Sequence, residues 1–226
     1  MGLKSMGQII LHSVNVAYRK HLVLKNIDLC FKQGEQWAIC GRNGSGKSTL
    51  LKTIYHLIKP LSGQIQWVNI PSSAMAYLAQ EPQFHASATL TVFEFVCFGL
   101  WYEISFYKAV NSSQVQQVQD ALHVVGLQDL AKQSIDRLSR GQLQRSRLAR
   151  ALVQKADFLL LDEPFNAVDE GSIQRFLSLF ARLRKEGKTV IAVLHNNDIV
   201  TQYFSHIVRL DKVSHTASNA FLTQRK

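Results

Sequence analysis

Several features that would assign the chain to a particular class are scarce or missing. The 226 residues include three cysteines, Cys30, Cys40 and Cys97, which lie far apart and show no CxxC spacing. We therefore expect neither a disulfide framework nor a cysteine-based zinc site, and a reducing compartment fits best. The first ten residues contain one lysine and no long apolar run, so we expect no signal peptide. No uncharged apolar stretch approaches the length of about 18 residues that a membrane span needs.

Acidic residues are few compared with basic ones. Lysine and arginine number 26 and aspartate and glutamate 16, which gives a net charge of +10 at pH 7. This surplus suits an anionic partner, whether a nucleotide phosphate, a nucleic acid or an anionic membrane face. Hydrophobic residues make up 46% and charged residues 19% of the chain. These ordinary values exclude bulk disorder and fibrous repeats.

Strand-like and helix-like segments alternate along the chain. Runs rich in Ile, Val and Leu predict strands at residues 8–16, 22–31, 36–40, 64–69, 75–79, 158–161, 189–194 and 207–210. Helical spacing predicts helices at residues 47–57 and 172–185, and the pattern turns helical between residues 84 and 154. Such alternation is typical of an α/β core with a parallel sheet, into which residues 84–154 are inserted as a helical region.

The strongest motif is the segment GRNGSGKST at residues 41–49, which lies between an apolar strand and a helix. It fits the phosphate-binding loop pattern G-x-x-x-x-G-K-[ST]. Its glycines let backbone N–H groups turn toward a phosphate, and the following helix directs its positive end to the same point. The flanking elements disfavour a chance glycine-rich turn. The expected nucleotide-binding residues are Gly41, Asn43, Gly44, Ser45, Gly46, Lys47, Ser48 and Thr49.

A second motif, FLLLDE at residues 158–163, is an apolar strand that ends in two adjacent carboxylates. Neighbouring strand residues point to opposite sides, so the two carboxylates can take separate tasks. Asp162 is suited to hold Mg²⁺ with the Ser48 hydroxyl, and Glu163 is suited to orient or deprotonate an attacking water. Alone, such a pair is usually a solvated strand end. Its place after a phosphate-binding loop favours the chemical interpretation.

Five further features occur in the order and spacing of one family. They are Tyr18, Gln80, the segment Leu138-Ser139-Arg140-Gly141-Gln142, the segment Asn166-Ala-Val-Asp169, and His195. Together with the two motifs above, they make the chain resemble the nucleotide-binding subunit of an ATP-binding cassette (ABC) transporter, from Tyr18 to about Leu210. The resemblance implies a P-loop NTPase core with a mostly parallel sheet, an antiparallel β edge subdomain and an inserted α-helical subdomain. It implies one domain over residues 1–226, with the core at 1–83 and 155–226 and the helical subdomain at 84–154.

In that family each of these residues has a role toward ATP and Mg²⁺, which the resemblance carries over. Tyr18 stacks on adenine, Gln80 joins Ser48 and Asp162 at Mg²⁺, and His195 contacts the γ-phosphate beside the catalytic Glu163. The residues that act across a head-to-tail dimer with ATP between its copies are Ser139, Gly141, Gln142 and Asp169. Taken singly, each feature has a structural alternative: a strand-end aromatic for Tyr18, a polar loop residue for Gln80, a structural histidine for His195, and a helix N-cap for Asp169.

Two positions depart from the family pattern. Arg140 stands where the signature usually has its first glycine, and its charge suits phosphate but leaves the affinity open. Asn196 follows the histidine where the family commonly has aspartate, which leaves the turnover rate open. Arg145, Arg147 and Arg150 follow the signature on an expected helix, where a solvated, ion-paired face is favoured over nucleic-acid binding.

Seven aromatic residues cluster within the short segment from Phe93 to Tyr107. They are Phe93, Phe95, Phe98, Trp101, Tyr102, Phe106 and Tyr107. A small helical region cannot easily bury so many rings, so we expect part of the cluster to be exposed for a partner. In the family this region receives a helix of an integral membrane permease.

The resemblance implies an ATPase subunit of a membrane transporter that works as a homodimer, peripherally, on the cytoplasmic face of the inner membrane. With Phe165 and Val168, the segment after Glu163 resembles that of the family branch that imports zinc, manganese or iron. This resemblance implies a substrate-binding protein as a further partner. Alternatives that stay open are a cassette for a non-metal substrate and a soluble cassette ATPase acting on ribosomes or DNA. The chain lacks the second cassette or the long coiled coil of those soluble types, so no nucleic acid is expected.

Overall fold

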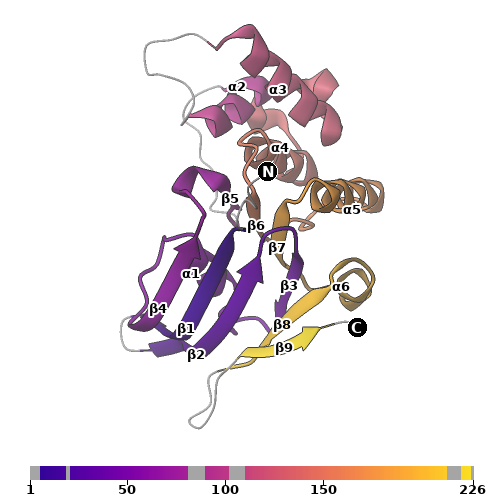
Figure 1. Ribbon diagram of the computed structural model, residues 1–226. Helices are drawn as coiled ribbons and strands as arrows, with labels where there is room; N and C mark the ends of the chain where they lie inside the picture. The colour runs from indigo at the N-terminus through magenta and orange to yellow at the C-terminus, as the bar shows by residue number, and fades with distance from the viewer. Residues whose placement is uncertain (1–5, 19–20, 81–89, 102–109, 213–219, 225–226) are drawn as a thin grey trace.

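The computed structural model describes residues 6–18, 21–80, 90–101, 110–212 and 220–224. Two sheets form the body of this part of the chain (Figure 1). The antiparallel sheet has the order β2-β1-β4, with β1 at Gln8–Tyr18, β2 at His21–Lys32 and β4 at Ser62–Val68. The other sheet has the order β5-β6-β7-β3-β8-β9 and is parallel except for β9. Its strands are β3 (Gln36–Gly41), β5 (Met75–Leu78), β6 (Phe158–Asp162), β7 (Thr189–Val193), β8 (His206–Leu210) and β9 (Ala220–Gln224).

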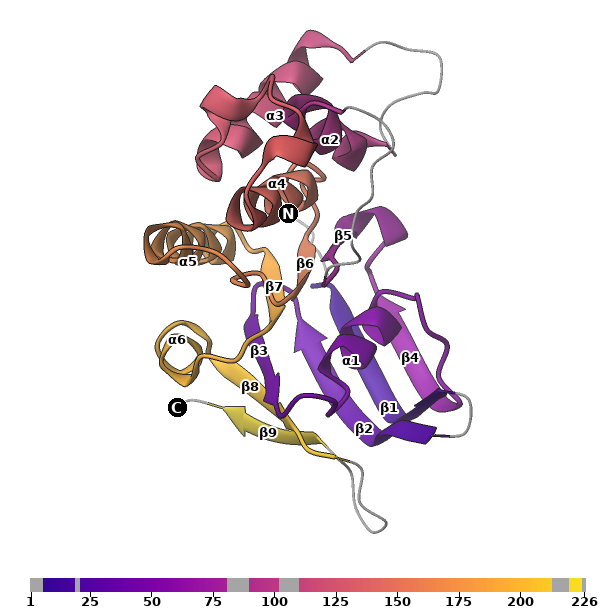
Figure 2. The ribbon, with the colours of Figure 1, turned by 180° about the vertical axis from the view of Figure 1, so that it is seen from behind.

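Six α-helices complete the described part of the fold. They are α1 (Lys47–Ile54), α2 (Val92–Cys97), α3 (Ser112–Val124), α4 (Arg140–Leu152), α5 (Glu170–Lys185) and α6 (Asn197–Tyr203). Helix α1 lies between the two sheets, while α2, α3 and α4 gather at one end of the molecule (Figure 2). Short 3-10 turns lie at Ser72–Ala74, Phe98–Leu100, Gln128–Leu130 and Ile135–Arg137.

The central strands are buried on both faces, which explains their continuous apolar sequence. In β6, Leu159 and Leu161 face a core shared with the helical region, while Leu160 faces the core formed with α1 and the antiparallel sheet. Alternate residues of a strand point to opposite faces, so one strand contributes to both cores. The loops at the carboxyl ends of β3, β6 and β7 therefore start from a rigid layer.

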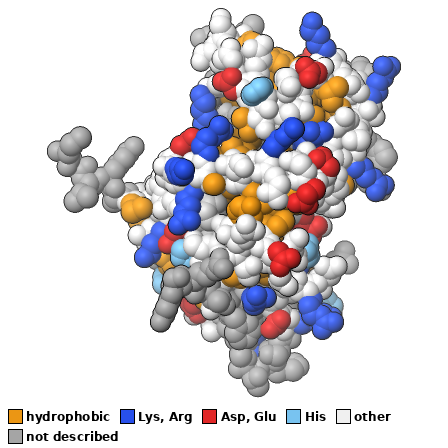
Figure 3. Space-filling view, turned by 90° about the vertical axis from the view of Figure 1, so that its right-hand side faces the viewer, with side chains coloured by type: hydrophobic (Ala, Val, Ile, Leu, Met, Phe, Trp, Pro, Cys, Tyr) orange, Lys and Arg blue, Asp and Glu red, His pale blue; other side chains and the backbone are white. Residues whose placement is uncertain are grey.

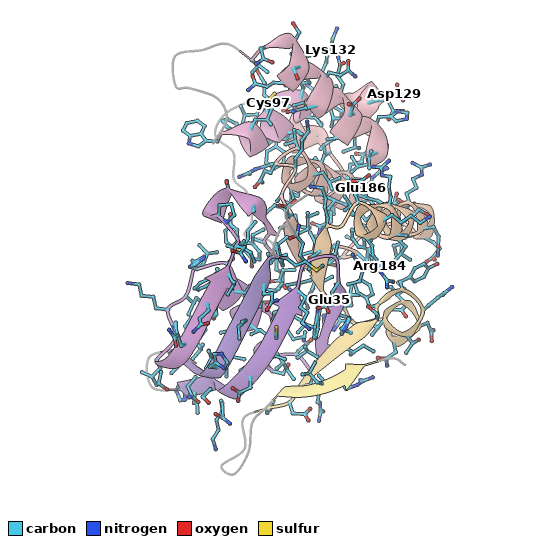
Figure 4. The ribbon with its side chains drawn as sticks, viewed as in Figure 1. Glu35, Cys97, Asp129, Lys132, Arg184 and Glu186 are labelled. Atoms are coloured by element: carbon cyan, nitrogen blue, oxygen red, sulfur yellow. The ribbon has the colours of Figure 1, made fainter. Side chains whose placement is uncertain are left out.

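Glu35 connects the start of β3 to the end of β2 and to β8. Its Oε2 accepts hydrogen bonds from Trp37 Nε1 at 2.8 Å and from the Lys32 backbone N–H at 2.9 Å. Its Oε1 lies 3.7 Å from Nε2 of His206 in β8. Figure 4 labels Glu35 at the amino end of the parallel sheet, on the opposite edge from the loops that follow β3, β6 and β7.

The predicted α/β fold class is confirmed, and the differences are local. The helix that starts at Lys47 ends at Ile54 rather than at residue 57, and His56 behind it has a positive φ of 64°. The strand β9 beyond Leu210 and the short helix α6 were not predicted. Neither segment carries a long periodic apolar pattern, and β9 gains its partners only from β8.

Charged side chains of both signs are interspersed on the side where α5 and α6 lie (Figure 3). Arg182 Nε, for example, lies 3.7 Å from Glu186 Oε1 on α5. The positive net charge is thus not gathered into one basic stripe on this side of the molecule.

Candidate functional site

The loop after β3 wraps the start of α1, as the phosphate-binding motif predicts. Gly41 ends β3 with φ 148°, and a side chain there would collide with the Leu210 backbone carbonyl. Gly46 has φ 99°, and its added Cβ would lie 2.8 Å from Leu24 of β2. Only glycine fits these two positions, because the backbone is left-handed at Gly46 and tightly packed at both.

A cavity of about 550 Å³ opens over this loop. Its lining residues are Val23, Asn43, Gly44, Gly46, Lys47, Ser48, Thr49, Gln80, Glu163 and His195. The structure therefore brings together residues from the loop, from the ends of β5 and β6, and from the segment after β7. Val23 was not among the sequence candidates, since an aliphatic residue in a strand carries no signal of a binding role. Gly41 and the buried Ser45 belong to the loop itself rather than to the lining.

Lys47 holds its charge at the floor of the cavity. Its Nζ donates to the backbone carbonyls of Gly41 at 2.9 Å and Arg42 at 3.0 Å. Burial lowers the pKa of Lys47, and the nearby Glu163 and Asp162 carboxylates oppose that effect. A phosphate would supply the anionic partner that this partly desolvated ammonium group lacks within the loop.

Three oxygen-bearing side chains converge beside Lys47. Ser48 Oγ lies 3.0 Å from Asp162 Oδ1 and 3.5 Å from Gln80 Oε1. A hydroxyl, a carboxylate and an amide oxygen form a hard donor set of the kind that Mg²⁺ prefers, so these residues fit that ion. Asp162 is fully buried, which raises its pKa, and the Ser48 hydrogen bond acts in the opposite direction.

Glu163 and His195 line the same cavity and contact each other. Glu163 Oε1 lies 2.9 Å from His195 Nε2. Glu163 also has a positive φ of 52°, a strained conformation that persists only where surrounding contacts hold it. Gln144 provides such contacts, since its Nε2 donates to the Glu163 carbonyl at 3.2 Å and to the Pro164 carbonyl at 3.4 Å. The sequence did not reveal Gln144, because a buried glutamine on α4 has no distinguishing pattern.

The signature segment forms the beginning of α4. Ser139 is the N-cap, its Oγ accepts from the Gln142 N–H at 3.2 Å, and its own N–H donates to Gln142 Oε1 at 2.9 Å. A Cβ on Gly141 would lie 2.6 Å from the Ala167 carbonyl oxygen. Gly141 therefore packs against the segment that follows Glu163, and none of Ser139, Gly141 and Gln142 lines the cavity of its own chain.

Asp169 and Asn196 each begin a helix. Asp169 caps α5 by accepting from the Ser172 N–H at 2.9 Å and the Ser172 hydroxyl at 2.7 Å, and these bonds lower its pKa. The N-cap interpretation of Asp169 is thus confirmed. Asn196 caps α6 by accepting from the N–H groups of Asp198 and Ile199. Tyr18 lies at the end of β1 with 46% of its surface exposed and outside the cavity lining.

A second hollow, of about 500 Å³, lies between the parallel sheet and the helical region; we call it the aromatic groove. Its lining is Tyr55, Tyr77, Leu78, Ala79, Phe95, Phe98, Gly99, Trp101, Arg147, Arg150, Ala151 and Gln154. Phe98 and Trp101 are 43% and 52% exposed, which confirms partial exposure of the aromatic cluster, whereas Phe95 is buried. The cluster members Tyr102, Phe106 and Tyr107 lie outside the described residues.

Two of the arginines that follow the signature belong to this groove. Arg150 lies over the Phe95 ring at 5.3 Å from its centroid, and Arg147 lines the same wall. Arg145 instead donates to the Val125 carbonyl at 3.5 Å. Arg145 and Arg147 are half-buried on α4, which packs against α2 and α3, and Arg150 is exposed.

Comparisons with known proteins agree on one family. The family described as ABC transporter matches residues 24–166. The chain is 34% identical over 222 residues to a manganese transport system ATP-binding protein of Listeria monocytogenes, covering 96% of this chain and 92% of the relative. It is 35% identical over 202 residues to a zinc transport system ATP-binding protein of Treponema pallidum, covering 88% and 76%.

Solved structures agree as well. The chain is similar to a dimeric bacterial ABC transporter cassette with a TM-score of 0.78 and 29% identity, covering 89% of this chain and 94% of that one. A dimeric post-hydrolysis state of the same cassette bound to ADP and Pi matches with a TM-score of 0.78 and 28% identity, over the same shares of both chains. Within the described residues, no helix has the length and apolarity to cross a membrane.

Proposed function

Since this chain belongs to the ABC transporter family and is an ATPase of that family, we propose that its cavity binds Mg²⁺ and ATP and that hydrolysis there drives import of a divalent metal ion. The observation that carries the proposal is that Lys47, Ser48 and the Glu163–His195 pair line one cavity, with the buried Asp162 carboxylate 3.0 Å from Ser48 Oγ. These groups supply what phosphoryl transfer to water needs: charge for the phosphates, oxygen ligands for a metal, and a base beside the reacting centre.

The chain's own residues divide the chemistry between them. Backbone N–H groups of the loop and Lys47 would hold the β- and γ-phosphates. Ser48, Gln80 and Asp162 would hold Mg²⁺, which, when bound, neutralises charge on the phosphates. Glu163 would orient the attacking water and accept its proton. His195 touches Glu163 at 2.9 Å, so it would fix the carboxylate and contact the γ-phosphate. Tyr18 would stack on adenine, which needs only an accessible ring face.

The site would be completed by a second copy of the chain. Ser139, Gly141 and Gln142 sit on α4, outside their own cavity, and Ser139 begins a helix whose N–H groups suit an anion. A head-to-tail dimer would bring this segment to the ATP of the partner copy, with Asp169 near the boundary. The similarity to dimeric cassettes supports this arrangement.

The aromatic groove would receive a permease subunit. Its exposed Phe98 and Trp101 resemble the aromatic anchors found at protein interfaces, and Arg147 and Arg150 provide polar contacts around them. Docking there would place the protein peripherally on the cytoplasmic face of the membrane, with a substrate-binding protein on the other side.

The metal cargo is proposed from the relatives named as manganese and zinc transport proteins. Phe165 itself cannot select a metal, because its ring packs against Phe176 and Phe180 at 6.3 and 6.1 Å, between centroids. Deletion of the gene should slow growth under chelation of zinc, manganese or iron, and one of these metals should restore it. Unchanged uptake of all three radioactive ions by the starved deletion strain would overturn the metal cargo and leave the ATPase untouched.

A further inference from the structure

Tyr77 both lines the aromatic groove and hydrogen-bonds Asp162, a proposed magnesium ligand. Its hydroxyl donates to Asp162 Oδ2 at 3.4 Å. Its ring stacks on Tyr55, with 5.3 Å between centroids and 30° between planes. Both tyrosines line the groove. A side chain in β5 therefore lines the groove and, through Asp162, is one contact away from Ser48, which lines the nucleotide cavity.

The pairing of β5 with β6 explains why the Tyr77 hydroxyl lies beside Asp162. Tyr77 is opposite Leu160 in the parallel register, and Asp162 follows two residues later on the same face of β6. Asp162 is fully buried and uses its two oxygens differently: Oδ1 accepts from Ser48 at 3.0 Å, and Oδ2 faces the Tyr77 hydroxyl. The orientation of the carboxylate is thus set from the phosphate loop on one side and from the groove on the other.

The partner ring connects the groove to the same site by a second path. Tyr55 is the C-cap of α1, the helix whose first turn carries Lys47 and Ser48. An occupant of the groove that presses on the Tyr55–Tyr77 stack would therefore act on the far end of α1 and on Asp162 together. Within that stack, the Tyr77 hydroxyl contacts the proposed magnesium ligand Asp162 directly.

We propose that Tyr77 is a positioning residue that holds Asp162 Oδ2 and couples the aromatic groove to the magnesium-binding edge of the nucleotide cavity. The proposal rests on the proposed function, which assigns Mg²⁺ to Asp162 and a partner to the groove. Coupling between two binding sites is reciprocal in free energy, so magnesium with nucleotide must change the affinity of the groove for its occupant by the same factor as the occupant changes the affinity for magnesium. A spectroscopic probe in the groove can therefore detect the coupling when no partner protein is docked there.

The first test measures nucleotide affinity of the full chain with a non-hydrolysable ATP analogue, with Mg²⁺ and with EDTA. Tyr77→Phe keeps the stacked ring and removes the hydroxyl alone. We expect the gain in affinity that Mg²⁺ produces to fall about fivefold, as for loss of one hydrogen bond, with the EDTA affinity unchanged. The matched control is Tyr203→Phe, which removes a hydroxyl at the same 3.4 Å from Gln174, between α6 and α5.

The second test reads the groove itself. The chain contains three tryptophans, so 5-fluorotryptophan labelling gives three ¹⁹F resonances, of which Trp101→Phe identifies the groove residue. Mg²⁺ added to the nucleotide-bound chain should shift the Trp101 resonance. Tyr77→Phe should remove at least half of that shift, and Tyr203→Phe should preserve it. Circular dichroism melts of both variants check that each is folded.

The outcomes separate the two proposals. An unmodified chain that gains no affinity from Mg²⁺ overturns the magnesium site and the role of Tyr77 together. A normal magnesium gain in Tyr77→Phe, or an equal loss in Tyr203→Phe, overturns the role of Tyr77 alone. An unchanged Trp101 shift in Tyr77→Phe overturns the coupling, even if Asp162 proves to be held by the hydroxyl.

Discussion

The nucleotide cavity and the aromatic groove are of similar volume, about 550 and 500 Å³, but they are built in opposite ways. Most of the cavity comes from one continuous loop, whose glycine dihedrals fix where Lys47 and Ser48 lie. The groove is assembled from α1, β5, α2 and α4, and no short motif describes it. A phosphate site can be encoded by local backbone geometry, whereas a protein-docking surface depends on how distant elements pack.

In the nucleotide cavity, we expect the largest loss of activity from substitution of Glu163. Glu163→Gln keeps the shape and removes the base, so ATP hydrolysis should fall at least about a hundredfold while ATP still binds. Single-turnover hydrolysis and nucleotide affinity measure the two effects separately. Glu170→Gln, on the exposed first turn of α5, is the matched control and should hydrolyse ATP normally. Normal turnover in Glu163→Gln would show that another group acts as the base.

Loss of the loop's charge should affect binding rather than chemistry alone. Lys47→Ala removes the ammonium group held between the Gly41 and Arg42 carbonyls, and ATP affinity should drop about thirtyfold, as for a charge-assisted hydrogen bond. Isothermal titration with an ATP analogue measures it. Lys59→Ala removes an exposed lysine from the loop after α1 and should leave the affinity unchanged. Equal affinities in both variants would contradict a phosphate role for Lys47.

The groove should respond to a charge placed on its exposed aromatic anchor. Trp101→Glu replaces a side chain that is 52% exposed, and binding of the chain to membranes that carry the transporter should weaken about tenfold. Co-sedimentation with those membranes measures the loss. Leu222→Glu alters an apolar residue of 49% exposure on β9, away from the groove, and serves as the control. If the two variants sediment alike, the groove is not the docking surface.

The smallest expected effect concerns the N-cap of α6, Asn196, which follows the cavity residue His195. Asn196 accepts from the N–H groups of Asp198 at 2.9 Å and Ile199 at 3.3 Å. Asn196→Ala should lower the free energy of unfolding by about 1 kcal/mol, the usual value of an N-cap, and shift Tm by a few degrees. Asn196→Asp retains a capping oxygen and should melt like the unmodified chain. Equal melting temperatures for all three would contradict the capping role.

Individual residues show which parts of the site could be predicted from the sequence. The cavity residues Lys47, Ser48, Glu163 and His195 were expected before their positions were known, because each belongs to a motif or ends an apolar strand. Gln144 was missed, although it holds the carbonyl groups of Glu163 and Pro164 at 3.2 and 3.4 Å. Its role depends on α4 packing against the end of β6, and an isolated glutamine in a helix gives no sign of that.

The aromatic cluster likewise shows what the sequence could and could not predict about the groove. Its composition predicted exposed rings near residues 93–107, and Phe98 and Trp101 are indeed exposed. Its composition could not assign Phe95 to the core, nor Tyr55 and Tyr77 to the same groove. Those assignments depend on where α1 and β5 lie relative to the helical region.

The sequence by itself determined the α/β alternation, the phosphate loop and the paired carboxylates, because each depends on backbone geometry or side-chain periodicity within a few neighbouring residues. Tertiary structure alone decided which of these groups meet. His195 reaches Glu163 across 32 residues of chain, and Tyr77 reaches Asp162 across 85. Such contacts depend on which strands, distant in the sequence, become neighbours in the sheet, and the packing of the whole sheet decides that. Local motifs therefore identify the residues proposed for catalysis, and the packing of the sheet decides which of them come into contact.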